Sequence, residues 1–424
     1  MRSRRRFISS GHRATLACAF VQSLLGSFVW SFTSNLDLQP GGTLVAGAQG
    51  WGSSLAWLPL LAGLALRVPV GVAADRFGPR RVGFLCVGLT LLGVYLSWLG
   101  FGWAPDRVVI ATLAGVAGAS LAASFALVSR WYPLEFQGLA LGLIGAGSMG
   151  GALALLLRPL LESSLGMGRA LGLLLVPILA LFAAYAFVAR DCPAVVSIAQ
   201  FPRPLAAGRK PDAWYCRVLW TLTLGVLAGL AAFLPTLLLE QYHLSGAVSA
   251  RVMALLFVAA SLAMPVGGAL ADDFGGLRAL QGALVAVAFF ALCVASIPQS
   301  TIEVGLMFAL FVALGTGSGA LFQVVGTRFR ARLGAVAGVI TATGGLCAFV
   351  LPEIFELLRR PTGTYGTGFV LVSFAAAGAA LLAARMQRDW LEEGGESGGR
   401  REPGRPPRGG GATGVALASS LHGA

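Results

Sequence analysis

Arg67 is the residue of this sequence best placed to do chemistry, because it is the only charged residue in the apolar run from 51 to 72. A guanidinium in such surroundings is costly, so it usually faces a polar cavity or a partner group. Its planar fork can donate two parallel hydrogen bonds to an oxyanion, which a lysine point charge cannot. Two interpretations follow. Arg67 binds an anion, or it extends toward the helix end or pairs with Asp75.

A short charged segment follows this run and recurs in the second half of the chain. The sequence GVAADRFG occupies 71–78, and GALADDFG occupies 268–275, at an offset of about 197 residues. The triplet Ser129-Arg130-Trp131 recurs at a similar offset as Thr327-Arg328-Phe329. Two homologous halves are the simplest explanation. By the same offset, the counterpart of Arg67 is Met264.

The composition identifies the solvent of the elements that carry these residues. Hydrophobic residues make up 56% of the chain and charged residues 12%, whereas a soluble domain carries roughly 25% charged residues. The apolar runs are about 20 residues long, which predicts membrane-spanning helices rather than a barrel. The six cysteines show no CxxC spacing, so we expect no disulfide, no metal and no cofactor.

Twelve apolar runs bounded by charged or turn residues are predicted to span the membrane. They are 14–33, 51–72, 82–102, 108–128, 138–158, 170–189, 216–239, 252–271, 279–298, 302–322, 333–352 and 366–386. Most of the 31 lysines and arginines fall in the termini and in alternate loops, so both termini are predicted to be cytoplasmic. The net charge of +13 therefore indicates orientation in a bilayer rather than nucleic acid binding.

The runs predict four regions in an all-α polytopic membrane protein. They are an N-terminal six-helix bundle (1–190), a Pro- and Arg-containing cytoplasmic linker (191–214), a C-terminal six-helix bundle (215–390) and a Gly/Arg-rich tail (391–424). The tail has too little apolar surface to offset its ordering entropy, so we expect it to be disordered.

The repeated charged loop resembles the G-x-x-x-D-R-x-G-x-R/K motif of the major facilitator superfamily of transporters. The resemblance implies a gate, in which the aspartate caps a neighbouring helix and pairs with a cytoplasmic arginine in one access state. The implied gating residues are Gly71, Asp75, Arg76, Gly78, Arg80, Arg81, Gly268, Asp272, Gly275, Arg130 and Arg328. Because Asp273 stands in the second copy where arginine is usual, we expect the gate to be weaker on that side.

Further segments resemble the nitrate/nitrite porter family over nearly the whole chain apart from the tail. They are 115–120, 128–133, 137–138, 145–150, 233–235, 315–323, 344–345 and 351–352. The resemblance implies an anion site built from Arg67, Gly147, Ser148, Trp220, Trp30, Gly344 and Gly345; for each, helix packing is the alternative role. Met264 departs from the family, which usually has a second arginine there, as do Ser148, Ser318 and Leu121.

The function predicted from these residues is alternating-access transport of a small solute in a bacterial cytoplasmic membrane. A small inorganic anion such as nitrate or nitrite is the first candidate. The alternatives are a carrier of small organic carboxylates or another solute, and a non-transporting sensor on the same fold. The acidic residues lie at span ends, which favours anion exchange or uniport over a proton relay. We expect a monomer, with lipid as its surroundings, and no enzymatic activity, because HExxH, P-loop and partnered GxSxG motifs are absent from the sequence.

Overall fold

The computed structural model describes residues 12–33, 58–99, 104–192, 211–296 and 299–399, and these residues are helical apart from turns. The helices of the first half are α2 (Arg13–Thr33), α4 (Leu58–Phe77), α5 (Pro79–Trp98), α6 (Ala104–Ala119), α7 (Leu121–Trp131), α8 (Gln137–Ala146), α9 (Met149–Leu165) and α10 (Met167–Phe187). Those of the second half are α11 (Pro211–Trp220), α12 (Val226–Glu240), α13 (Gly246–Phe274), α14 (Gly276–Ala295), α15 (Ser300–Arg328), α16 (Leu333–Gly345), α17 (Cys347–Thr362) and α18 (Gly366–Gly399).

Eleven helical segments of the described residues are long and apolar enough to cross a membrane. The helix α4 is outside these eleven, but it packs among them and carries Arg67, so the architecture matches the twelve predicted spans. Large apolar side chains such as Phe187 and Phe374 are exposed on the outside of the bundle, as expected of a surface that faces lipid. Helices α13 and α15 run beyond their predicted limits because the apolar pattern marks only the part of a helix that lies in lipid.

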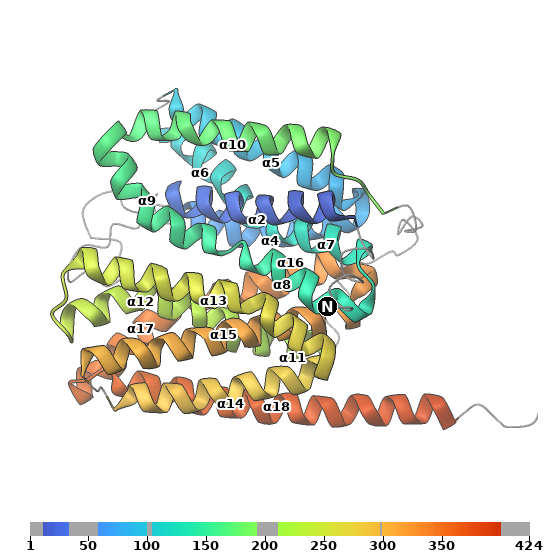
Figure 1. Ribbon diagram of the computed structural model, residues 1–424, viewed down its shortest axis with the longest axis vertical. Coiled ribbons are helices and arrows are strands. Elements are labelled where there is room, and N and C mark those ends of the chain that lie inside the picture. The colour runs from blue at the N-terminus through green and yellow to red at the C-terminus, as the bar shows by residue number, and fades with distance from the viewer. Residues whose placement is uncertain (1–11, 34–57, 100–103, 193–210, 297–298, 400–424) are drawn as a thin grey trace, which may run out of the picture.

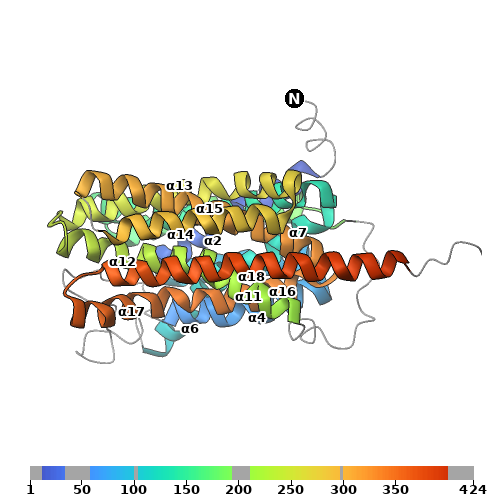
Figure 2. The same ribbon diagram turned by 90° about the horizontal axis from the view of Figure 1, so that it is seen from below.

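The helices form two bundles that lie side by side, as Figure 1 shows, with the first half in blue to green and the second in yellow to red. The two most extensive crossing contacts between the bundles are those of α4 with α16, and of α8 with α13 and α15. We call the end of the molecule where α4 and α13 finish the closed end, and the end where α2 and α12 finish the far end. The start of α2 and the end of α18 both lie at the closed end (Figures 1 and 2).

Four of the spans change their hydrogen-bonding pattern near the middle. The α6–α7 span does so at Ser120, and the α8–α9 span tightens at Gly147 and Ser148, whose backbone N–H groups donate to the third residue before them. A matching turn joins α16 to α17, where Leu346 donates to the carbonyl of Thr343. Between α11 and α12 lies a π-helical turn, Thr221–Gly225, a feature that often marks functional sites.

The end of the chain differs from the sequence-based expectation. The helix α18 continues to Gly399, so residues 391–399 are helical rather than disordered. Trp390 on this helix donates from its indole nitrogen to Asp212, at 3.3 Å, and the Arg328 guanidinium lies 4.7 Å from the centre of its ring. These contacts fasten α18 to the start of α11 directly before the extension, and a composition rule does not take them into account. Residues 193–210 of the expected linker and 400–424 of the expected tail lie outside the described residues.

Candidate anion-binding cavity and gate

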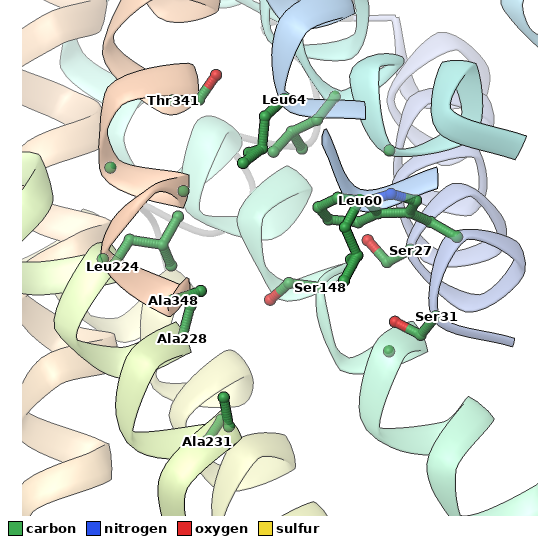
Figure 3. Close-up of a pocket in the computed structure, with 18 of the residues that line it drawn as sticks. Ser27, Ser31, Leu60, Leu64, Ser148, Leu224, Ala228, Ala231, Thr341 and Ala348 are labelled. Atoms are coloured by element: carbon green, nitrogen blue, oxygen red, sulfur yellow. The ribbon is translucent and has the colours of Figure 1, made fainter. Parts of the chain in front are cut away.

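A cavity of about 260 Å³ lies between the two bundles, on the far-end side of their crossing contacts. Both halves line it (Figure 3). Each of the four irregular turns described above contributes at least one residue to its wall. From the first half it is lined by Ser23, Ser27, Trp30, Ser31, Leu60, Leu64, Arg67, Ala117, Gly118, Ser120, Leu121, Ser148, Gly151, Ala152 and Leu155. From the second half it is lined by Trp220, Leu224, Gly225, Ala228, Ala231, Ala232, Met253, Phe257, Thr341, Gly344, Gly345, Ala348 and Phe349.

Arg67 is the charged residue of this lining, and only 8% of its surface is exposed. Its Nε donates to the carbonyl of Gly118 at 3.4 Å, and one Nη donates to the carbonyl of Thr341, across the bundle interface, at 2.9 Å. Its guanidinium carbon lies 5.2 Å from the centre of the Trp30 ring. A guanidinium has five N–H donors, so three remain after these two bonds.

The interpretation that Arg67 pairs with Asp75 does not hold in this structure. Asp75 lies eight residues further along α4, roughly 12 Å by helical rise. Its carboxylate is used by Arg130, at 3.5 Å, and by backbone N–H groups of α16. Within the described residues, no carboxylate neutralises Arg67. Its remaining donors therefore suit a visiting anion.

The other residues predicted for the site separate into two groups. Trp30, Ser148, Trp220, Gly344 and Gly345 line the same cavity as Arg67. Gly147 does not: it lies against the Ser23 side chain, where it allows α2 to approach the turn between α8 and α9. Gly147 is therefore a helix-packing residue, the role that the sequence analysis gave as the alternative to anion binding.

Met264, the counterpart of Arg67, is fully buried beside Gly145, which the Phe322 ring also contacts. Met264 has no exposed surface and is absent from the cavity lining. The Phe322 ring lies between Phe125 of the first half and Trp220 of the second, with ring centres 4.8 and 5.0 Å away. This aromatic group crosses the interface at the level of Met264. Gly145 has no room for a side chain, because Phe322 occupies that space.

Several lining residues were not predicted from the sequence. Ser27 and Ser31 stand one and two turns after Ser23 on α2, and their hydroxyls lie along the cavity (Figure 3). Their spacing of four residues was a signal that could have found them. Thr341 carried no comparable signal, because it acts through its backbone carbonyl. Neither did Phe322, which lies outside the lining and is an ordinary apolar residue of a span.

The closed end is held by two equivalent contacts, one from each repeat of the charged loop. Asp75 accepts hydrogen bonds from the backbone N–H groups of Gly334 and Ala335, at 3.2 and 2.8 Å. Asp272 accepts bonds from those of Gly138 and Leu139, both at 2.8 Å. Each aspartate thus caps the first turn of a helix in the opposite half, where a negative charge is favourable.

The hydrogen bonds of the two caps show no weakening on the second side, because Asp272 caps its helix at least as closely as Asp75. Whether the gate as a whole is weaker there stays a prediction. The halves differ in their arginines instead. Arg130 pairs with Asp75, whereas its counterpart Arg328 pairs with Asp212 at 2.8 Å. The substitution at Asp273 leaves the capping carboxylate of Asp272 in place.

The glycines of the repeated loop have two separate structural roles. A side chain on Gly71 would collide with the carbonyl of Gly334, and one on Gly268 would collide with that of Gly138. The helices can cross this closely only because both partners lack side chains. Gly78 and Gly275 instead adopt φ values of 96° and 94°, which favour glycine, as the chain turns into α5 and α14.

The remaining basic residues of the first loop lie outside the interface. Arg80 donates to the carbonyl of Ala186 at 2.8 Å, which fastens α5 to the end of α10 within the first half. Arg76 and Arg81 are exposed at the closed end. A further contact comes from Arg330, which follows α15 and donates to the carbonyl of Tyr132 in the first half, at 3.3 Å.

Comparisons with known proteins agree with this architecture. The chain is 26% identical over 371 residues to the nitrite extrusion protein of Bacillus subtilis, covering 87% of this chain and 90% of that protein. It is 30% identical over 358 residues to a probable nitrate/nitrite antiporter, NarK1, of Thermus thermophilus, covering 76% and 81%.

Solved structures share the fold at low sequence identity. The fucose:proton symporter of E. coli matches with a TM-score of 0.67 at 13% identity, covering 88% of this chain and 98% of that one. The human organic anion transporter MFSD10 matches with a TM-score of 0.66 at 18% identity, covering 88% and 99%. The family model of the Major Facilitator Superfamily matches residues 13–352. With two six-helix halves around a central cavity, the chain belongs to this superfamily of integral membrane transporters.

Proposed function

We propose that this protein exchanges small inorganic anions of the nitrate and nitrite type across a bacterial cytoplasmic membrane, with Arg67 as the anion-binding residue. The single observation that carries the proposal is the setting of Arg67. Its guanidinium lies in a cavity between the halves, with three donors left over and no carboxylate partner among the described residues. The names of these relatives, which include nitrite extrusion and nitrate/nitrite antiport, support the same substrate class.

Alternating access follows from the position of the contacts that join the halves. Asp75 and Asp272 hold the closed end together, while the cavity lies toward the far end. Separating these two caps and closing the far end would expose Arg67 to the other side. The basic loops at the closed end support a cytoplasmic position for it. Both termini are then cytoplasmic, and the working unit is a monomer, because one chain supplies the whole cavity.

Exchange is favoured over proton symport because the described lining of the cavity contains no acidic residue. The buried acid Glu303 lies in the first turn of α15 at the far end, with 1% of its surface exposed and one carboxylate oxygen without a partner. Its position at a span end agrees with the sequence analysis. Its complete burial, beside Tyr242, does not follow from the sequence.

The test is counterflow in proteoliposomes that contain the purified protein. Vesicles loaded with nitrite should take up isotopically labelled nitrate, and vesicles loaded with gluconate should not. Dissipating the pH gradient at a clamped voltage should leave the rate unchanged. Arg67→Ala should abolish the uptake, while Arg169→Ala, at an exposed arginine of α10, should not. Equal uptake by the Arg67→Ala protein, or dependence on the pH gradient, would contradict the proposal.

A further inference from the structure

The two walls of the cavity differ in chemistry. The first half supplies Arg67 and the serine hydroxyls, and those of Ser27 and Ser31 make no hydrogen bond to the protein in the described structure. Ser148 also faces the cavity, and its hydroxyl lies 3.0 Å from that of Ser261. All the charge and nearly all the polar side chains of the lining therefore come from one side.

The second half presents an apolar surface opposite. Leu224, Ala228, Ala232, Phe257 and Phe349 line it. Figure 3 shows Leu224, Ala228 and Ala348 on the left, across the cavity from Ser27 and Ser31. The polar atoms of Thr341 are already used, since its carbonyl accepts from Arg67 and its hydroxyl donates to the carbonyl of Gly338. The indole N–H of Trp220 is a neutral donor, so this wall offers no second charge.

The pseudo-symmetric position for a second charge is also closed. Met264 is fully buried, and the Phe322 ring stands with Trp220 and Phe125 at that level of the interface. A dianion bound at Arg67 would have to place its second charge against apolar groups, which is costly without a partner. An apolar tail in the same place would be removed from water, which is favourable.

We infer that the cavity also binds short unbranched monocarboxylates, with the carboxylate on Arg67 and the alkyl chain against the second-half wall, and that it rejects dicarboxylates. This inference rests on the proposed anion site at Arg67. It goes beyond that site because it assigns the opposite wall to an alkyl group. A planar carboxylate presents two oxygens to a guanidinium as nitrate does, so the same donors serve both kinds of anion.

The expected affinities follow from the apolar wall. Burying one methylene contributes about 0.8 kcal/mol, which is about fourfold in Kd. The series formate, acetate, propionate and butyrate should therefore bind more tightly at each added carbon, by up to about fourfold per step. Oxalate and malonate should bind at least about tenfold more weakly than acetate and propionate, respectively.

Direct calorimetric titration of the purified protein with each carboxylate tests this without using nitrate. A flat or falling affinity along the series, or oxalate binding as tightly as acetate, would overturn the inference. If nitrate counterflow is observed but the series is flat, this inference fails and the proposed function stands. If the series rises but nitrate is neither bound nor exchanged, the proposed function fails and the assignment of the wall stands.

One substitution tests the wall itself. Ala228→Ser places a hydroxyl on the apolar side and should lower the gain per methylene to below about twofold. The control is Ala377→Ser, on the exposed face of α18, which should leave the gain unchanged. An unchanged gain in the Ala228→Ser protein would overturn the assignment of the alkyl group to this wall.

Discussion

The bidentate role of Arg67 can be tested most sharply by Arg67→Lys, which keeps the positive charge and removes the planar fork. The arginine uses two of its five donors on the carbonyls of Gly118 and Thr341 and has three left for an anion. A planar oxyanion can accept two of these in parallel. A lysine ammonium at this position offers one well-directed bond instead.

The expected loss is one hydrogen bond to a charged group, which contributes about 1.5–3 kcal/mol. That corresponds to a rise in the Kd for nitrate of about 10- to 150-fold. Arg67→Ala removes the charge as well and should weaken binding further, beyond the range of Arg67→Lys. Chloride has no pair of acceptor atoms to match the fork, so its affinity should fall less in the lysine variant. The ratio of nitrate to chloride affinity is therefore the decisive quantity.

Titration calorimetry of the purified proteins with nitrate and chloride measures that ratio. Arg169→Lys makes the same chemical change at an exposed site of α10 and should leave both affinities within about twofold. A shift of the closed end caused by losing the Arg67 bond to Thr341 would change the affinities for nitrate and chloride alike, so it would leave their ratio unchanged. If the lysine variant keeps the wild-type preference for nitrate, or if lysine and alanine variants are equally weak, the fork does not bind the anion.

Three further predictions concern the contacts around the cavity. Gly71→Ala should separate the two halves at the closed end, because the new methyl group meets the Gly334 carbonyl. Spin labels attached at Arg81→Cys and Arg278→Cys, in a protein without its native cysteines, should then move apart. An unchanged distance between the labels would contradict this contact. Asp75→Asn should weaken the same closure by about 1–2 kcal/mol. The effect should exceed that of Asp272→Asn, because only Asp75 also pairs with Arg130. A larger increase in label distance in the Asp272→Asn protein would show that the arginine does not contribute. Glu303→Gln should leave nitrate exchange intact and still insensitive to the pH gradient. If the unsubstituted protein shows uptake driven by the pH gradient and this variant loses it, Glu303 is a coupling residue.

The sequence predicted the parts of this protein that depend on the solvent around each residue. Lipid requires long apolar helices, so the spans could be located from hydropathy, and the shared ancestry of the halves left the loop repeat visible at a constant offset. A single arginine in an apolar run is costly enough to stand out. Arg67 could therefore be selected before any coordinates were known, and it does line the cavity.

Other features arise only when the two halves meet. Hydropathy cannot distinguish Phe322, which contacts the other half across the interface, from an apolar residue that faces lipid. It also could not predict that Asp272 caps α8 as closely as Asp75 caps α16. The contrast between a wall of hydroxyls and an apolar wall is likewise invisible along the chain, because its residues come from distant helices. The sequence alone determined the helices, the repeat and the presence of the Arg67 charge inside an apolar run, since each depends on a residue and its neighbours in the chain. Tertiary packing decided which groups surround that charge, because those groups come together only when one bundle closes against the other.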